Sequence, residues 1–165
     1  MLRTKDILDE KDPRVRAKNT DVDFPLNDEY KDIIPEMLKH LRYSQIEKLS
    51  KKYDLRPGMG LAAPQLGINK NFFVVCYEVK DGVFDDYILI NPKVISYSEE
   101  MIYAGEGEGC LSVNREVEGI VPRHARITVG FYDINGNYKE ERVREEISVA
   151  FQHEMDHLDG IMFTD

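Results

Sequence analysis

The pentad HEMDH at residues 153–157 carries the clearest chemical signal in the chain. Two histidines four residues apart point to the same side of a helix, so both imidazoles can bind one metal ion. The glutamate between them is placed to hold or deprotonate a metal-bound water. Ala150, His153, Glu154 and His157 share this side of the helix. Burying two histidines and a glutamate is costly unless something binds them, so we predict a metal site rather than histidines that only satisfy polar neighbours.

A third ligand for this ion has to come from upstream of the pentad. Zinc proteases with the pattern HExxHxxGxxH take a downstream histidine, whereas this sequence has Phe163 at that position and reaches its last residue at Asp165. The upstream candidates are two cysteines and two histidines, namely Cys76, Cys110, His40 and His124. Cys76 lies in an apolar run, which predicts a buried and unreactive thiol. His40 lies among basic residues, which predicts a solvated side chain, and the charged stretch around His124 also argues against a ligand.

Cys110 is the candidate that its neighbours favour. Residues 106–109 read Glu-Gly-Glu-Gly, and glycines allow the backbone to approach a site closely. A thiolate is a strong ligand for a divalent metal. One cysteine and two histidines leave coordination positions open for water and substrate, which is the arrangement of a catalytic metal site.

The composition bounds the class of protein that can carry this site. A length of 165 residues fits one domain spanning the whole chain, 1–165. A net charge of −9 argues against direct binding of nucleic acid or of an anionic membrane surface. There is no apolar run of membrane-spanning length and no apolar core of a signal peptide at the start. Two cysteines favour a reducing compartment, so we expect a cytoplasmic protein.

The elements that must position these residues follow from periodicity and turn signals. A long helix is predicted over 28–53, with Pro35 either in its first turn or at a kink. Strands are predicted over 72–79, 87–90 and 93–97, followed by a hairpin of 125–132 and 138–144 around Asn135-Gly136, and a final helix over 147–158. The sum is an α+β domain: mainly antiparallel strands packed around a C-terminal helix that carries the HExxH motif, with an additional N-terminal helix.

Three segments in order resemble the peptide deformylase family. Residues 58–65 read GMGLAAPQ, residues 108–112 read EGCLS and residues 152–157 read QHEMDH. One such motif is weak, whereas three in register from residue 58 to residue 157 are specific. The long helix and the extra residues before the first motif are similar to the Gram-positive-type subgroup. Relatives often continue beyond the third motif, so we expect a shortened chain or a short family member.

The resemblance implies an enzyme that removes the formyl group from N-formyl-methionyl peptides of newly made proteins, at the ribosome. It implies that the metal is bound by Cys110, His153 and His157. It further implies that Glu154 is the general base and acid, and that an oxyanion hole is formed by the side-chain amide of Gln65 and the backbone N–H of Leu111. Gly60 and Gly109 would bind the substrate backbone. The implied native metal is Fe(II), with zinc, nickel or cobalt able to occupy the same ligands.

A methionine side chain in the substrate needs an apolar pocket beside the metal. Val149 and Ala150 lie about one turn before the first histidine, and Met59 precedes the first-motif Gly60, so these three residues are pocket candidates, with an ordinary core role as the alternative. The pair Glu145-Glu146 stands where the family more usually has small or apolar residues, which leaves the pocket rim and the peptide preference open.

Two rival functions stay open at this point. A metallopeptidase acting on internal peptide bonds is disfavoured by the missing downstream ligand. A non-catalytic relative that binds formyl peptides or ribosomes would have a structural metal closed by four protein ligands, whereas three are identifiable here. Ser112 and Asp156 have structural interpretations, and Asp156 could also orient a ligand histidine.

Overall fold

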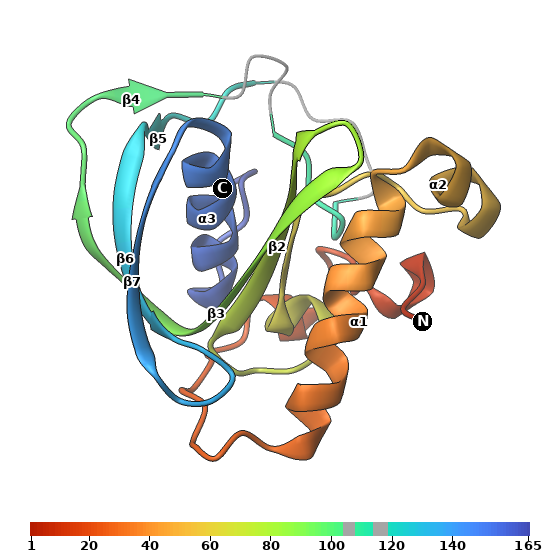
Figure 1. Cartoon of the computed structure of the whole chain (residues 1–165), viewed down its shortest axis with the longest axis horizontal. Helices are drawn as coiled ribbons and strands as arrows, with labels where there is room; N and C mark the ends of the chain where they lie inside the picture. The colour runs from red at the N-terminus through yellow and green to blue at the C-terminus, as the bar shows by residue number, and fades with distance from the viewer. Residues whose placement is uncertain (104–107, 114–118) are drawn as a thin grey trace.

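The computed structural model describes residues 1–103, 108–113 and 119–165. The α-helices are α1 (Asp28–Ser44), α2 (Glu47–Tyr53) and α3 (Glu145–Leu158). The strands are β1 (Gly60–Ala62), β2 (Phe72–Lys80), β3 (Val83–Tyr97), β4 (Met101–Ile102), β5 (Arg123–His124), β6 (Arg126–Tyr132) and β7 (Tyr138–Arg144). A five-stranded antiparallel sheet has the order β1-β2-β3-β6-β7, and β4 pairs with β5. The curved sheet wraps around α3, and α1 lies on its other face (Figure 1). The α+β prediction is confirmed.

Strand β2 separates the two hydrophobic cores of the molecule. Successive side chains of a strand point to opposite faces of the sheet. Phe72, Val74 and Cys76 therefore pack toward the core that contains α1, while Phe73 and Val75 pack toward the core that contains α3. All five side chains are fully buried, which explains why this run reads as continuously apolar.

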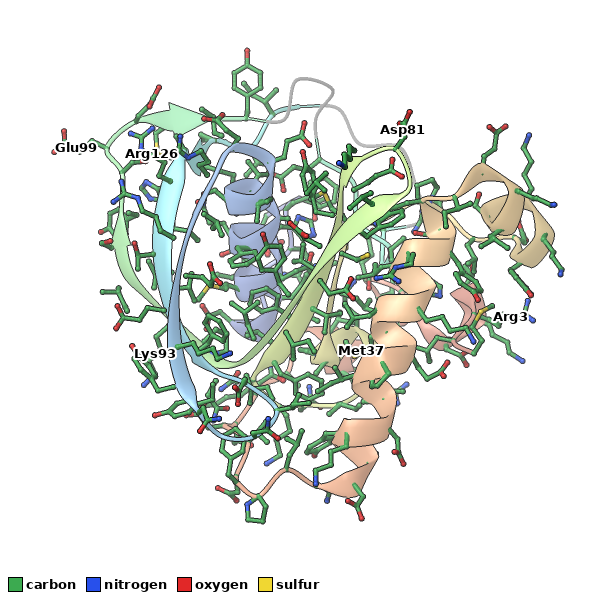
Figure 2. The ribbon with its side chains drawn as sticks, viewed as in Figure 1. Arg3, Met37, Asp81, Lys93, Glu99 and Arg126 are labelled. Carbon is green, nitrogen blue, oxygen red and sulfur yellow. The ribbon has the colours of Figure 1, made fainter. Side chains whose placement is uncertain are left out.

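Helix α1 begins at a side-chain cap and buries one apolar stripe. The Asn27 side chain accepts a hydrogen bond from the Glu29 N–H at 2.8 Å, which satisfies one of the unpaired donors of the first turn. Met37 lies on the buried stripe, fully inaccessible, and faces the sheet, whereas Asp81 lies at the exposed tip of the β2–β3 hairpin (Figure 2). The helix starts at Asp28, so Pro35 lies in its interior and not in its first turn.

The prediction of one helix over 28–53 is wrong at Gln45 and Ile46, where the chain leaves the helix between α1 and α2. Ile46 is extended, with φ −103° and ψ 111°. The Gln45 amide donates to the carbonyl oxygens of Gly58 and Cys76, at 3.0 and 2.8 Å. These tertiary hydrogen bonds tie the end of α1 to the first motif, and helical periodicity alone gives no sign of them.

Strands β2, β6 and β7 follow the sequence prediction, whereas β3 differs from it and the short strands β1, β4 and β5 were not predicted. The predicted segments 87–90 and 93–97 form one long strand, which pairs with β2 along its first half and with β6 along its second. The register shifts between Ile90 and Lys93, and Asn91 has φ 51°. Asn91 therefore marks a bend within a strand, where the sequence suggested a break. The hairpin of β6 and β7 around Asn135-Gly136 is confirmed.

Helix α3 is anchored at its middle and at its C-terminal end. The ring of Phe151 meets Phe73 and Tyr87 edge-on, with centroids 5.5 and 5.3 Å apart. The Asn19 amide donates to the carbonyl of Leu158 at 2.7 Å, and the helix begins two residues before the predicted start at 147. In the part of the chain that the structure describes, no helix combines the length and apolar character needed to cross a membrane.

We predict that Gly160→Ala destabilises the fold more than Gly82→Ala does. Both glycines have φ 75°, a backbone that costs a residue with a Cβ about 1–2 kcal/mol. A Cβ at Gly160 would also lie 2.9 Å from the carbonyl oxygen of Arg16, whereas no described atom lies within 4 Å at Gly82. We expect about 1 kcal/mol of additional loss at Gly160. Urea unfolding of both variants measures the difference, and equal losses would contradict the close contact at the end of α3.

Candidate active site

Three side chains that suit a metal ion converge beside α3. The ligand atoms of Cys110, His153 and His157 all lie within 4.8 Å of one another. The Cys110 Sγ is 3.3 Å from the Nε2 of His157, which is 3.1 Å from the Nε2 of His153. Both histidines come from one face of α3, as four-residue spacing predicts, while the thiol comes from the loop before β5.

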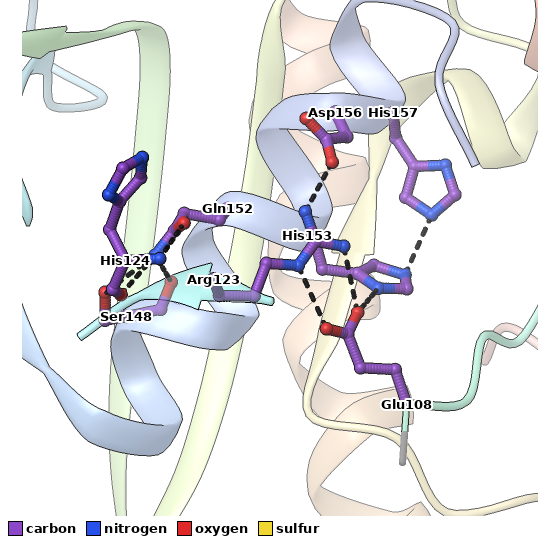
Figure 3. A network of polar contacts seen from close by, with 8 residues as sticks. All are labelled: Glu108, Arg123, His124, Ser148, Gln152, His153, Asp156 and His157. Carbon is purple, nitrogen blue, oxygen red and sulfur yellow. Dashed lines mark hydrogen bonds and ion pairs between the residues drawn. The ribbon is translucent and has the colours of Figure 1, made fainter. Parts of the chain in front are cut away.

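A buried carboxylate orients the first histidine. The Nδ1 of His153 lies 2.9 Å from the carboxylate of Glu108, and Nδ1–H donation leaves Nε2 with a free lone pair for a metal. Arg123 donates two hydrogen bonds of 2.9 Å to Glu108 and also pairs with Asp156 (Figure 3). Burial would raise the pKa of Glu108, but hydrogen bonds from His153 and Arg123 outweigh it and lower the pKa to about 2. Glu108 is therefore an anion at neutral pH.

The two histidines respond differently to their surroundings. Burial lowers the pKa of His157 to about 3, so its imidazole is neutral and available as a ligand. Burial acts in the same direction on His153, but Glu154, Cys110 and Glu108 overcome it and raise its pKa to about 10. The negative groups around His153 thus favour a positive charge at this point, which a proton or a metal ion can supply.

Glu154 is a buried carboxyl group poised to exchange a proton. Burial is the main cause that raises its pKa to about 7, against the opposing influence of His153 and Arg123. Its Oε1 is buried, and no described residue hydrogen-bonds to it. The backbone of Gly60 in β1 packs directly on this carboxyl group, since a Cβ at Gly60 would lie 2.8 Å from the Glu154 Cδ. Only glycine fits at this position without moving Glu154.

The Gln65 side chain is held with its amide nitrogen toward the thiol. Its Oε1 accepts a hydrogen bond from the Ala62 N–H at 2.9 Å, which fixes the orientation of the amide group. Its Nε2 donates to the Ser112 hydroxyl at 3.0 Å and lies 3.6 Å from the Cys110 Sγ. Gln65 and Ser112 are both buried, so the first motif delivers an amide donor to the second.

Leu111 contributes its backbone to the same region. Its side chain is buried in the core with α1. Among the described residues, none accepts a hydrogen bond from the Leu111 N–H. Unpaired backbone donors are rare in protein interiors, so this N–H is a candidate donor to a ligand.

The remaining predicted substrate contacts lie on α3 and in two loops. Val149 and Ala150 are each 8% exposed, and the half-buried Met59 packs against the core with α3. Gly109 is exposed, and no described atom lies within 4 Å of a Cβ built there. The predicted close backbone approach at Gly107 lies outside the described residues.

Glu145 and Glu146 form the start of α3. Glu145 and Glu146 are both exposed, and Glu145 has φ 56°. Burial raises the pKa of Tyr77, and the adjacent Glu146 carboxylate, which hydrogen-bonds to it, adds to the effect.

The other candidate ligands lie elsewhere. Cys76 is fully buried, and burial is the main cause that raises its pKa to about 11, so the prediction of an unreactive thiol is confirmed. The prediction of a solvated His40 is wrong: it is 1% exposed, with Nδ1 3.0 Å from the Leu2 carbonyl oxygen. His124 is half-buried, with its ring tilted against that of Tyr97 and its Nδ1 2.8 Å from the carbonyl oxygen of Ser98.

The donor set fits a divalent metal ion. One sulfur and two imidazole nitrogens suit zinc, iron, nickel or cobalt. The unpaired buried oxygen of Glu154 marks a polar atom that needs a partner in the site. Together with the excess of buried negative charge, these observations fit a resident cation.

Comparison with known proteins identifies the family. The model of the polypeptide deformylase family matches residues 4–165. The chain belongs to the peptide deformylase family. The peptide deformylases of Halalkalibacterium halodurans and Oceanobacillus iheyensis are 48% and 46% identical over the whole chain, covering 91% and 90% of their own lengths. A probable peptide deformylase from Synechococcus phage S-SSM7 superposes with a TM-score of 0.79 at 33% identity, covering 96% of this chain and 97% of that one.

The family resemblance inferred from the three motifs is therefore confirmed, and with it the identity as an enzyme that removes the formyl group from N-terminal methionine. The similarity to deformylases of the Bacillus group is consistent with the Gram-positive-type subgroup.

Sequence reasoning missed two residues of this deformylase site. Asp156 was a candidate for orienting a ligand histidine, but it pairs with Arg123, and Glu108 contacts His153 instead. Glu108 stands two residues before the ligand cysteine inside the second motif, and that position was the available signal. Arg123 had no local signal, because its role depends on β5 lying beside α3.

We predict that Glu108→Gln weakens metal binding by roughly 10–100-fold, because it removes the anion that orients the His153 imidazole. Competition with a chelating dye measures the metal affinity. Glu100→Gln is the matched control, since Glu100 also pairs with an arginine, Arg126, but its side chain is 61% exposed. Wild-type metal affinity in Glu108→Gln would show that His153 is oriented by other contacts.

Proposed function

We propose that Cys110, His153 and His157 hold one divalent metal ion, natively Fe(II), and that the site hydrolyses the formyl amide of N-formyl-methionyl nascent peptides. Zinc, nickel or cobalt suit the same ligands. The observation that carries the proposal is the convergence of a thiol and two imidazoles beside the buried, unpaired carboxyl oxygen of Glu154. We further propose that residues 1–165 act as one catalytic domain in the cytoplasm, on peptides emerging from the ribosome.

Glu154 is the proposed general base and acid. A divalent cation supplies Lewis acidity, which lowers the pKa of water and so provides a nucleophile at neutral pH. Glu154, with a pKa near 7, accepts the proton of the attacking water and returns it to the nitrogen of the leaving amine. A carboxyl group with a pKa near the working pH suits both directions of this transfer. The contact with Gly60 fixes the position of the carboxyl group during both steps.

Gln65 and Leu111 are the proposed donors to the developing oxyanion. Attack on the formyl carbon places negative charge on the formyl oxygen, and fixed N–H groups stabilise that charge without reorganising. The Gln65 amide is oriented by Ala62 and Ser112, and the Leu111 N–H is free of described partners. Removal of one such donor typically costs roughly 10²–10³ in rate.

The substrate backbone is proposed to bind along Gly60 and Gly109, with the methionine side chain near Met59, Val149 and Ala150. Gly60 lies in the edge strand β1, and an edge strand offers unpaired backbone groups to an extended peptide. Met59, Val149 and Ala150 are apolar side chains, which suits contact with an unbranched thioether.

Formate release from formyl-Met-Ala tests the proposed reaction directly. We expect stoichiometric formate with the formylated dipeptide and no cleavage of an unformylated peptide by the same metal-loaded protein. Cleavage of internal bonds in the unformylated peptide without formate release would instead identify a metallopeptidase. Binding of formyl-Met-Ala without turnover would identify a non-catalytic relative.

We predict that Glu154→Ala retains the metal but loses most of its turnover, because the proton acceptor is removed and the ligands remain. Cys110→Ser is the contrasting variant: it should lose metal and activity together, because a hydroxyl is a poorer ligand than a thiolate. Elemental analysis and formate release, measured on the same preparations, separate the two effects. Substantial turnover in Glu154→Ala would exclude its role as the base.

A further inference from the structure

We infer that Arg56 is a positioning residue, whose guanidinium fixes and polarises the peptide bond between Cys110 and Leu111 so that the Leu111 N–H is aimed at the reacting oxygen. The inference deepens the proposed function and rests on it. Neither the metal ligands nor the proton transfer by Glu154 require Arg56, so it is a separate claim about this chain.

The Arg56 side chain hydrogen-bonds to three carbonyl groups of one turn. Its Nη2 donates to the carbonyl oxygens of Cys110 and Leu111 at 3.1 and 2.7 Å, and its Nη1 donates to that of Val113 at 2.8 Å. The planar guanidinium holds its donors in a fixed fork, so one side chain defines the directions of three carbonyl groups. The Val113 N–H also donates to the Cys110 oxygen at 3.0 Å, but Arg56 supplies the positive charge.

The geometry of the peptide bond transmits this contact to Leu111. A trans peptide is planar, so its C=O and N–H groups point in opposite directions. Holding the Cys110 oxygen against the guanidinium therefore directs the Leu111 N–H to the other side of the turn and opposes a flip of the peptide. A charged donor on the oxygen also polarises the amide, which makes its N–H a stronger donor through hydrogen-bond cooperativity.

The segment that carries Arg56 is itself fixed. The preceding Leu55 is 5% exposed. The Gly58 N–H donates to the Ser44 hydroxyl at 3.1 Å, and the Gly58 oxygen accepts from the Gln45 amide at 3.0 Å. Both partners lie at the end of α1, so the guanidinium projects from an anchored backbone and not from a free loop.

The same segment also contacts the Leu111 side chain. A Cβ at Gly58 would lie 3.0 Å from a methyl carbon of Leu111, so the Gly58 backbone packs tightly on that side chain. Arg56 restrains the Leu111 backbone, and Gly58, two residues later, restrains its side chain. The segment from Arg56 to Gly58, at the start of the first motif, thereby positions the Leu111 N–H, which is the proposed oxyanion donor in the second motif.

Steady-state formate release by Arg56→Met, Arg56→Lys and Arg56→Ala tests the inference. We expect kcat of Arg56→Met to fall roughly 10-fold with KM and metal content unchanged, because a transition-state interaction is weakened but not removed. Arg56→Lys should lie between this variant and wild type, because one ammonium cannot reach three carbonyls. Millimolar guanidinium chloride should restore part of the kcat of Arg56→Ala. A merely structural role would not give this rescue.

Arg42→Met is the matched control, since Arg42 is also a surface arginine with two hydrogen bonds, both to Asp86. It should keep wild-type kcat. Wild-type kcat in Arg56→Met overturns the inference, as does a loss that follows the loss of metal and is not rescued by guanidinium. If wild type and Arg42→Met release no formate, the proposed function itself fails and the role of Arg56 falls with it.

Discussion

The site depends on the balance of buried charge around His153. The carboxyl groups of Glu108 and Glu154 are both buried near this imidazole, and the Cys110 thiol lies beside the two histidines. Arg123 balances Glu108 through two hydrogen bonds. Unpaired charges in an apolar interior are costly, so the remaining negative charge favours a positive charge at the imidazoles, which a proton or a metal ion can supply. Binding of the proposed metal ion would therefore stabilise the site.

The fold positions these charged groups by packing α3 firmly against the sheet. Phe151 locks one side of the helix against two aromatic rings of the sheet, which leaves the histidines and Glu154 on the side that faces β1. The Gly60 backbone then approaches the Glu154 carboxyl group more closely than any residue with a Cβ could. The sheet thus acts both as a core and as the wall that fixes the proton acceptor.

The features that could be predicted from the sequence are those set by residues close to one another in the chain. Helical spacing was sufficient to place the two histidines on one face, and Asn135-Gly136 was sufficient to locate a hairpin. The break at Gln45, the bend at Asn91 and the burial of His40 were not predictable, because each depends on a partner distant in sequence: the Gly58 carbonyl, the backbone of Val22 and the Leu2 carbonyl. The role of Glu108 was missed for the same reason.

The same contrast between local and long-range contacts applies within the site. The helical ligands need only α3, whereas Cys110 comes from a turn with no regular structure, so its position relative to the histidines has to be fixed by tertiary contacts. A closed circuit of polar contacts does this: Asp156 pairs with Arg123, Arg123 with Glu108, and Glu108 with His153, which lies three residues before Asp156 on the same helix.

Because the circuit begins and ends on α3, it holds Glu108 against this helix. Cys110 follows Glu108 by two residues, so it is held near the two histidines of the helix as well. From the opposite side the turn is held by Gln65 and Arg56. The position of Cys110 is therefore fixed although the residue lies in a loop. These contacts place the proposed third ligand, Cys110, beside the HExxH helix although it lies upstream of that helix in the sequence.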